Sequence, residues 1–315
     1  MAQTTAFLFP GQGSQALGMG KDLAHAYPVA RDTFAEADDI LGFSLSGLCF
    51  EGPEESLNDT INTQPAIFVA SLATLRVLQS GGWSVSPAFS AGHSLGEYSA
   101  LVASGALAFA DGLRLVRERG RLMKVAGERS PGGMAAILNV DNQAVADICQ
   151  RASQQTGKVV QVANYNSPGQ VVISGDNEAL DVAMELAQAA GARRVVRLAV
   201  SIAAHSPLMA VIVDEFRQAV EATPIQPPTV PVVANVTARP LATVKDTHQE
   251  LVAQLTSSVR WVDSVEYMVG QGITCFIEIG PKDVLTGLVR RINKGVGAVA
   301  CGTLEGVQAV LKSSQ

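Results

Sequence analysis

The sequence predicts an α/β protein with a mainly parallel sheet and one small inserted subdomain. Short apolar runs, typical of buried strands, alternate through most of the chain with longer segments whose apolar residues recur at helical spacing. The order changes within residues 131–199, to strand, helix, strand, strand, helix, strand. This βαββαβ order is typical of a ferredoxin-like unit, so we expect a large domain of residues 1–130 and 200–315 and a ferredoxin-like subdomain between its two parts.

The first part of the large domain is expected to begin with a strand at residues 6–9, which a Pro-Gly pair ends. Residues 64–79 carry apolar side chains at three- and four-residue spacing and predict a helix. A short buried strand is expected at residues 88–91, and a sharp turn then leads into a helix over residues 95–104.

The inserted segment contains six predicted elements. They are a strand beginning near Met134, helices at residues 142–155 and 178–190, and strands at residues 159–163, 170–174 and 193–198. The turn sequence Asn-Ser-Pro-Gly at residues 166–169 joins the two central strands. The large pattern then resumes with strands near residues 230–235 and 275–279. A cleft between the two domains is where we expect a substrate.

The composition excludes several classes of protein. With 315 residues, 47% of them hydrophobic, the chain can bury a full core and is not disordered. Its 29 acidic residues outnumber its 23 basic residues and give a net charge of −6, which argues against a nucleic-acid-binding protein. The four cysteines form no CxxC pair, so we expect neither a disulfide framework nor a metal site, and reduced, mostly buried thiols instead.

The sequence shows no pattern of export or membrane anchoring. The first ten residues lack a basic segment followed by a long apolar one. The richest apolar stretch, residues 100–110, is too short to span a bilayer. We therefore expect a cytoplasmic protein that does not contact a membrane, with a monomer as the default state.

Residues 92–96, Gly-His-Ser-Leu-Gly, match the pattern GxSxG. In this motif a serine lies on a tight turn between a strand and a helix, with its hydroxyl exposed and the next backbone N–H directed at a developing oxyanion. The match follows a predicted strand and opens a predicted helix, as the chemistry requires. Ser94 is thus a candidate nucleophile in an α/β-hydrolase-like domain; the alternative is that it only caps the helix.

A serine hydroxyl needs a base, and the chain has four histidines. His93 adjoins the serine and is expected to point away from it, while His25 and His248 lie in polar helical contexts that predict exposed side chains. His205 directly precedes Ser-Pro, a helix-start sequence, and so lies at a boundary where functional residues collect. The alternative for His205 is a structural role. No acidic residue lies near it in the sequence to complete a triad.

Five segments with distinctive motifs follow one another along the chain: residues 9–15 (FPGQGSQ), 92–98 (GHSLGEY), 119–121 (RGR), 205–209 (HSPLM) and 278–281 (EIGP). Together they resemble the malonyl-CoA:acyl carrier protein transacylases. These segments span nearly the whole chain, and their combination is far more specific than GxSxG alone. The family's small ferredoxin-like subdomain agrees with the βαββαβ order.

The resemblance implies a ping-pong transfer of malonyl from malonyl-CoA to the phosphopantetheine thiol of an acyl carrier protein, through a malonyl-serine. Ser94 would attack the thioester, and His205 would take the proton and return it to the leaving thiol. The backbone N–H groups of Gln12 and Leu95 would form the oxyanion hole. Neither a metal nor another cofactor is implied.

The resemblance also implies roles for residues around this pair. Arg119 would hold the free malonyl carboxylate, Gln64 and Asn166 match positions that line the pocket, and a main-chain carbonyl near the segment matching Gln254 would orient the histidine. A buried carboxylate is costly unless a guanidinium meets it with two parallel hydrogen bonds, so an arginine suits this role.

The residues alone do not single out Arg119. The residues Arg114, Arg117, Arg119, Arg121 and Lys124 share one predicted helix, and most of them are expected on a solvated face. Only the register of the resemblance selects one of them.

Pocket size and carrier docking are further expectations. The residue before the histidine is often bulky or hydroxylated in the family, and here it is Ala204. We expect malonyl to be preferred with modest tolerance for an α-methyl group, since one methylene changes binding by about 1–3 kcal/mol. Carrier proteins are usually acidic, and the candidate basic patch to receive one consists of Arg193, Arg194, Arg290, Arg291 and Lys294, with ordinary surface charge as the alternative.

Other functions share part of this pattern. The same chemistry occurs in freestanding acyltransferases that load polyketide synthase carriers and in the malonyl transferase subunit of malonate decarboxylases. A serine hydrolase or thioesterase shares GxSxG and the histidine and would release free malonate. A binding module without catalytic activity would form no acyl-serine.

Overall fold

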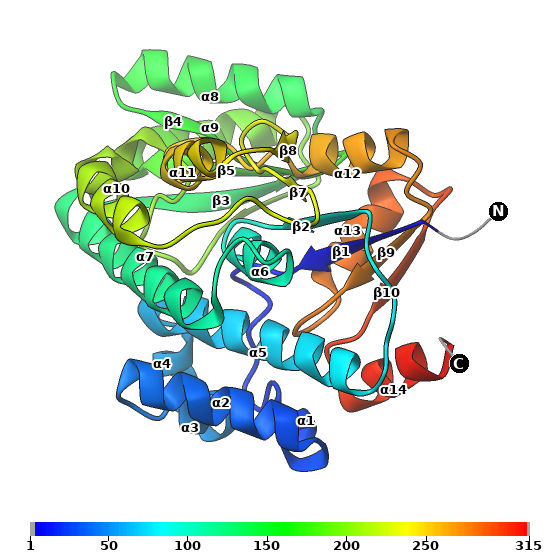
Figure 1. Ribbon diagram of the computed structural model, residues 1–315. Coiled ribbons are helices and arrows are strands. Elements are labelled where there is room, and N and C mark those ends of the chain that lie inside the picture. The colour runs from blue at the N-terminus through cyan, green and yellow to red at the C-terminus, as the bar shows by residue number, and fades with distance from the viewer. Residues whose placement is uncertain (1–3, 314–315) are drawn as a thin grey trace.

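A six-stranded sheet forms the centre of the computed structural model, which describes residues 4–313. Its strands are β1 (Thr5–Phe9), β2 (Phe89–Gly92), β7 (Val232–Val233), β8 (Pro240–Leu241), β9 (Cys275–Glu278) and β10 (Gly297–Ala300). They lie in the order β10-β9-β1-β2-β7-β8, and every neighbouring pair is parallel except β7 and β8 (Figure 1). The predicted α/β class with a mainly parallel sheet is confirmed.

The central strand β1 is buried on both faces. Phe7 and Phe9 belong to a large apolar core on one side of the sheet, whereas Ala6 and Leu8 belong to a smaller core on the other. This burial explains why the strand reads as a continuous apolar run rather than as an alternating one. The strands predicted at residues 6–9, 88–91 and 275–279 are confirmed, but the one at residues 230–235 is reduced to Val232–Val233.

Helices cover both faces of this sheet. The larger core lies under α1 (Lys21–Ala26), α2 (Pro28–Leu41), α3 (Leu45–Glu51), α4 (Glu54–Asn58), α5 (Thr60–Ser80), α6 (Gly96–Ala103), α7 (Phe109–Arg129), the 3-10 helix η1 (Pro207–Ile212), α10 (Val213–Ala222), α11 (Val244–Ala253) and α14 (Leu304–Ser313). The smaller core lies under α12 (Trp261–Gly270) and α13 (Val284–Ile292).

Helix α5 is longer and more deeply buried than predicted. It begins at Thr60 because the Asp59 side chain accepts the Ile61 backbone N–H at 3.3 Å and so caps the helix before the apolar run starts. By length and composition α5 could cross a membrane, a property that we did not expect of any segment; yet 83% of its apolar window is buried inside the protein, as in the core helix of a globular protein.

A second, four-stranded sheet occupies one end of the molecule, and α1–α4 occupy the other (Figure 1). Its strands are β3 (Gly132–Leu138), β4 (Val160–Ser167), β5 (Gln170–Asp176) and β6 (Arg194–Arg197), in the antiparallel order β4-β5-β3-β6. The helices α8 (Asn142–Thr156) and α9 (Asn177–Ala189) pack on one face with their own apolar core. All six elements predicted for this segment are present.

The other face of the four-stranded sheet is turned to the large sheet. Met134, Ala163 and Val172 belong to the larger core. Backbone hydrogen bonds fasten β4 to the segment before α12, because Tyr165 N–H donates to Val259 O at 3.0 Å and Val259 N–H donates to Ala163 O at 2.8 Å. The fold thereby places the edge strand β4 of the small sheet against the loop that precedes α12 in the large domain.

Candidate active site

Ser94 lies on a strained turn between β2 and α6. Its φ angle is 52°, in the left-handed region that a non-glycine residue seldom adopts. The two motif glycines permit this turn, since a Cβ on Gly92 would lie 1.9 Å from the carbonyl carbon of Gly96, and one on Gly96 would lie 2.0 Å from Phe9 O. Asn235 fixes the turn from the side by accepting the Ser94 N–H at 2.6 Å and donating to Gly92 O at 2.7 Å.

His205 is placed as a base for Ser94. Its Nε2 lies 2.8 Å from Ser94 Oγ, and its Nδ1 lies 2.7 Å from the backbone oxygen of Gln254. A carbonyl oxygen can only accept, so Nδ1 carries the proton and Nε2 is free to receive one from the serine. Burial, together with the charge of Arg119, lowers the pKa of His205 to about 3, which keeps the imidazole neutral.

Arg119 brings a buried positive charge to the same serine. Its side chain is 2% exposed, Nη2 donates to Ser94 Oγ at 3.1 Å and to Gln254 Oε1 at 2.9 Å, and Nη1 donates to Gln64 Oε1 at 2.7 Å. Within the described part of the chain no carboxylate forms an ion pair with Arg119, and its Nε has no hydrogen-bond partner. Burial lowers the pKa of this guanidinium. The site therefore holds a cation with unused capacity to bind an anion.

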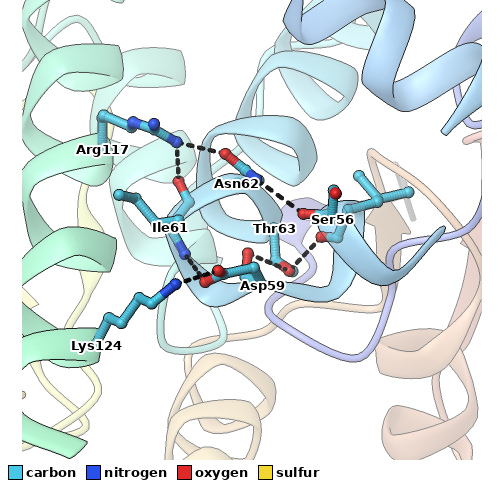
Figure 2. A network of polar contacts seen from close by, with 8 residues as sticks. Ser56, Asp59, Ile61, Asn62, Thr63, Arg117 and Lys124 are labelled. Carbon is cyan, nitrogen blue, oxygen red and sulfur yellow. Dashed lines mark hydrogen bonds and ion pairs between the residues drawn. The ribbon is translucent and has the colours of Figure 1, made fainter. Parts of the chain in front are cut away.

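The register of α7 follows from its close contact with the start of α5. A Cβ on Gly120 would lie 2.8 Å from Thr60 O, so only a glycine permits this approach. Figure 2 shows the polar contacts that fix the two helices on their outer side, where Arg117 donates to Ile61 O at 2.7 Å and Lys124 pairs with Asp59 at 2.5 Å. Arg119 is consequently directed inward.

A cavity of about 500 Å³ opens beside these groups. Its lining combines polar residues from the small sheet, from α7 and from the loops after β1 and β2 with apolar side chains, among them Gln12, His93, Ser94, Leu95, Arg119, Met123, Met134, Asn164, Asn166, Val172, Leu198, Val200, Ile202, Ala204 and His205. Within residues 4–313, the backbone N–H groups of Gln12 and Leu95 have no hydrogen-bond partner. Two free donors beside a serine are what an oxyanion requires.

The remaining residues selected from the sequence occupy different positions. Asn166 lines the cavity, and its Oδ1 lies 2.8 Å from His93 Nε2. Gln64 is fully buried behind Arg119 and is absent from the cavity wall. His93 also lines the cavity, and its ring contacts Asn166 on the small sheet rather than Ser94. His248 is half-buried, in contrast to the exposed side chain that we expected, while His25 is exposed.

The amino-acid sequence is similar to those of known acyltransferases. Residues 6–306 match the family model described as "Acyl transferase domain". The chain is 45% identical over 307 residues to the malonyl CoA-acyl carrier protein transacylase of Escherichia coli strain K12, an alignment that covers 98% of both chains. The corresponding Bacillus subtilis protein is 43% identical over 308 residues, which are 98% of this chain and 96% of the relative. The chain belongs to the malonyl CoA-acyl carrier protein transacylase family.

Solved structures of this family superpose closely on the chain. A malonyl-transacylase solved in complex with a type II PKS acyl-carrier protein gives a TM-score of 0.95 at 43% identity and covers 99% of this chain and 100% of its own. The Coxiella burnetii malonyl CoA-acyl carrier protein transacylase gives 0.95 at 39% identity, covering 99% and 98%. The fold and its mainly parallel sheet are therefore those of the family.

Besides the apolar and amide residues of the cavity wall, the sequence analysis missed three residues that hydrogen-bond to the catalytic turn, to His205 or to Gln254. Asn235 ends the segment predicted as a strand at residues 230–235, and the carboxyl end of a parallel strand is a position where ligand-binding side chains gather, so this signal was available. Gln161, which donates to His205 O at 2.7 Å, and Glu97, which accepts from Gln254, had no comparable signal. None of the described residues forms a cluster of three or more His, Cys, Asp or Glu side chains that could hold a metal ion.

Proposed function

We propose that this acyltransferase moves a malonyl group from malonyl-CoA to the phosphopantetheine thiol of an acyl carrier protein through a malonyl-Ser94 intermediate. One observation carries the proposal: Ser94 Oγ lies at once 2.8 Å from a neutral imidazole and 3.1 Å from a buried guanidinium. The imidazole suits acyl transfer. The guanidinium suits an acyl group that ends in a carboxylate, as malonyl does.

The acylation step follows from the placement of the protons. His205 Nε2 takes the proton from Ser94 Oγ as the oxygen attacks the thioester carbonyl, and the N–H groups of Gln12 and Leu95 stabilise the oxyanion. The bond from the carbonyl carbon to sulfur then breaks, and His205 returns the proton to the CoA thiolate. In the second half-reaction the carrier thiol attacks the malonyl ester and the same proton transfers occur in reverse.

Gln254 replaces the acidic member of a triad in this proposal. Its backbone oxygen accepts from His205 Nδ1–H and orients the ring without adding a negative charge beside the malonyl carboxylate. Asn166 and the small Ala204 are among the residues that line the cavity, and Gln64 accepts a hydrogen bond from Arg119 on the side away from it. We propose that this space accepts malonyl in preference to methylmalonyl, which the ratio of kcat/KM for the two CoA thioesters will measure.

We also propose two structural units. The large α/β-hydrolase-like domain comprises residues 1–130 and 200–315, and its serine turn between a parallel strand and a helix supports this description. A ferredoxin-like subdomain comprises residues 131–199; the strand order β4-β5-β3-β6, with both helices on one face, supports it. The substrate then enters between them, since Asn166 belongs to one unit and Ser94 to the other.

All five basic residues chosen for carrier docking are exposed. Two of them lie on connected elements, since Arg291 donates to Gln170, Gln170 pairs with Leu138, and Leu138 pairs with Arg194. About 10 Å, two strand spacings, therefore separates Arg194 from the residue that Arg291 contacts. We propose that the five residues form one basic rim and that this rim is the docking surface for an acidic carrier.

Charge reversal tests this surface. Arg290→Glu with Arg291→Glu should raise the apparent KM for the carrier protein and leave that for malonyl-CoA unchanged, because long-range attraction acts on the macromolecular partner. The matched control is Arg31→Glu with Arg114→Glu, two exposed arginines away from the cavity lining. An unchanged KM for the carrier would remove the rim from the proposal.

Cellular location, oligomeric state and further binding partners are also matters of proposal. We propose that the enzyme acts in the cytoplasm as a monomer, without a metal, a further cofactor, nucleic acid or a membrane. Its net charge of −6 and the burial of α5 support the last two points. Light scattering at micromolar concentration tests the monomer, and a mass near twice 32.9 kDa would exclude it.

The decisive experiment follows the acyl group itself. The protein is incubated with malonyl-CoA, its intact mass is measured, and phosphopantetheinylated carrier protein is then added. A malonyl adduct that is absent in Ser94→Ala and that moves to the carrier supports the transfer. An adduct lost only to water would indicate a hydrolase, and a folded protein that forms no adduct would indicate a binding module.

A further inference from the structure

Glu97 is a buried carboxyl group that takes no direct part in the proposed reaction. It lies in the first turn of α6, and its side chain is fully buried. One of its oxygens accepts the backbone N–H of Asn235 at 3.0 Å, and the other accepts from Gln254 Nε2. Among residues 4–313 no cationic side chain forms an ion pair with it. Burying a carboxylate without such a partner is costly, so the position requires an explanation.

Gln254 connects Glu97 to both functional side chains. Its Nε2 donates to Glu97 and, at 3.1 Å, to the backbone oxygen of Ser94. Its Oε1 accepts from Arg119 Nη2 at 2.9 Å, and its backbone oxygen lies 2.7 Å from His205 Nδ1. A shift of this one residue would therefore displace the base and the guanidinium together.

Glu97 fixes the direction of the Gln254 amide. A carboxylate accepts hydrogen bonds and a guanidinium only donates them, so an amide between the two must turn its NH₂ group to Glu97 and its oxygen to Arg119. The reverse orientation would set amide hydrogens against the guanidinium and the amide oxygen against the carboxylate. Without a pure acceptor at position 97, only Arg119 and the Ser94 backbone oxygen favour this orientation, so the amide is held less firmly.

A second buried carboxyl, Glu250 on α11, is bound differently from Glu97. Its Oε1 accepts the Val236 N–H at 2.8 Å, whereas both oxygens of Glu97 face donors, one of them the Gln254 amide. Burial raises the pKa of both groups, and the neighbouring Glu250 raises that of Glu97 further. Of the two carboxyl groups, only Glu97 forms a hydrogen bond with the Gln254 side chain.

The Glu97 carboxyl group lies one amide group away from the guanidinium. A direct ion pair would occupy the N–H groups of Arg119 and compete with a substrate carboxylate. The intervening amide contacts both groups and leaves the guanidinium available on the cavity side.

We propose that Glu97 is a positioning residue which, through the side chain of Gln254, holds the Arg119 guanidinium and the His205 ring toward Ser94 and so determines the preference for an acyl group that carries a carboxylate. This inference rests on the proposed function for the identity of the acyl group. The path of contacts from Glu97 through Gln254 to His205 does not depend on which acyl group is transferred.

The first test is Glu97→Gln, which preserves size and replaces one acceptor oxygen with an NH₂ group. This NH₂ group would face one of the two donors at position 97, so either the Asn235 contact or the contact with the Gln254 amide is lost. We expect kcat/KM for Ser94 acylation by malonyl-CoA to fall on the order of 10²-fold and the malonyl-to-acetyl preference to fall roughly tenfold. Labelling of Ser94 by phenylmethylsulfonyl fluoride, a neutral probe, should slow as well, because the His205 ring is less well held.

The matched control is Glu250→Gln, a change of the same size at a neighbouring buried carboxyl group. Its amide oxygen can still accept from Val236 N–H, so acylation, acyl preference and labelling should stay within about twofold of the unchanged protein. A loss in this variant as large as that in Glu97→Gln would overturn the specific role of Glu97.

A second variant keeps the proposal testable if Glu97→Gln does not fold. Gln254→Met removes the side-chain amide through which Glu97 acts and keeps the backbone carbonyl, so the malonyl-to-acetyl preference should fall and labelling by the sulfonyl fluoride should slow, as in Glu97→Gln. An unchanged preference in this variant, or an equal loss with both CoA thioesters in folded Glu97→Gln, would overturn the proposal. If the unchanged protein forms no malonyl-serine, the proposed function fails; the labelling rate still decides whether Glu97 positions His205.

Discussion

Arg117 and Arg119 lie two positions apart on α7 and illustrate two uses of the same side chain. Because two residues rotate a helix by about 200°, the two guanidinium groups face opposite sides. Arg117 faces the start of α5, where it donates to Ile61 O and to Asn62 Oδ1 (Figure 2). Arg119 faces the cavity and is bound by neutral amides and the serine hydroxyl.

The two arginines differ in the kind of group to which they donate hydrogen bonds. Position 65 is a proline, which has no N–H, so the Ile61 carbonyl lacks its partner within α5 and Arg117 supplies one. Arg119 completes no backbone structure, and its Nε has no partner at all. Arg117 is therefore expected to contribute to folding, and Arg119 to binding.

The largest expected effect comes from Arg119→Met. Loss of the guanidinium should lower kcat/KM for malonyl-CoA by about 10²–10³-fold, which lies within the roughly 2–5 kcal/mol that removal of one partner of a buried charge pair costs. Acetyl-CoA, which offers no carboxylate, should lose far less. Stopped-flow or mass-based acylation rates measure both, with Arg117→Met as the control, and an equal loss for the two thioesters would contradict the assignment of Arg119.

The next effect concerns pH and the influence of Arg119 on His205. Because burial and the Arg119 charge lower the pKa of His205 to about 3, the base form should persist and kcat/KM for acylation should change little between pH 8 and pH 5. A histidine of pKa 6.5 would lose about 30-fold at pH 5. Arg119→Met should raise the pH below which kcat/KM falls, since the positive charge that helps to lower the pKa of His205 is removed.

The lowered pKa of His205 should also make the folded protein less stable at acidic pH. As the pH falls below 6.5, the unfolded chain binds a proton at this histidine that the folded chain does not, so the free energy of unfolding should decrease. Because the protein is less stable at low pH, acylation is measured soon after a jump to that pH, before unfolding occurs. A rate that follows a pKa near 6.5 in the unchanged protein would show that His205 is accessible to solvent.

A smaller effect is expected for Arg117→Met, and it falls on stability. Leaving the Ile61 carbonyl without its donor should lower the free energy of unfolding by about 1–2 kcal/mol, with little change in acyl preference. Urea unfolding measures the loss. In a Pro65→Ala background the helix supplies its own N–H to Ile61 O, so the same substitution should cost less; an identical cost in both backgrounds would refute this explanation.

The smallest effect is expected from Lys124→Met. The ion pair with Asp59 spans 2.5 Å, but both side chains are partly exposed, at 48% and 31%. Its loss should lower the free energy of unfolding by less than about 1 kcal/mol, and less still in high salt. Urea unfolding at low and high ionic strength checks this, and a salt-independent loss would point to packing rather than charge.

Much of the fold was predictable because local rules determine it. The parallel strands are continuous apolar runs, the helices of the small unit follow aspartate caps, and the serine turn requires glycines at two fixed positions. The start of α5 was missed because the cap at Asp59 precedes the apolar pattern. The strand before Asn235 was overestimated because much of that apolar segment pairs with no neighbour.

The site was predictable only in part. Ser94 follows from its motif and His205 from its position before a helix, but Arg119 was selected by resemblance alone, since its periodicity does not distinguish it from Arg117. Glu97 and Gln254 meet across 157 sequence positions. Contacts of this range depend on the assembled fold and leave no local pattern in the sequence.

Burial of α5 has a consequence for synthesis. This helix packs against α2, made before it, and against α6, α7 and α14, made after it. At about 5–20 residues per second, translation from Ser80 to Arg129 at the end of α7 takes several seconds. During that interval an apolar helix long enough to enter a bilayer lacks its principal cover, so the nascent chain offers a binding site to chaperones until α7 emerges.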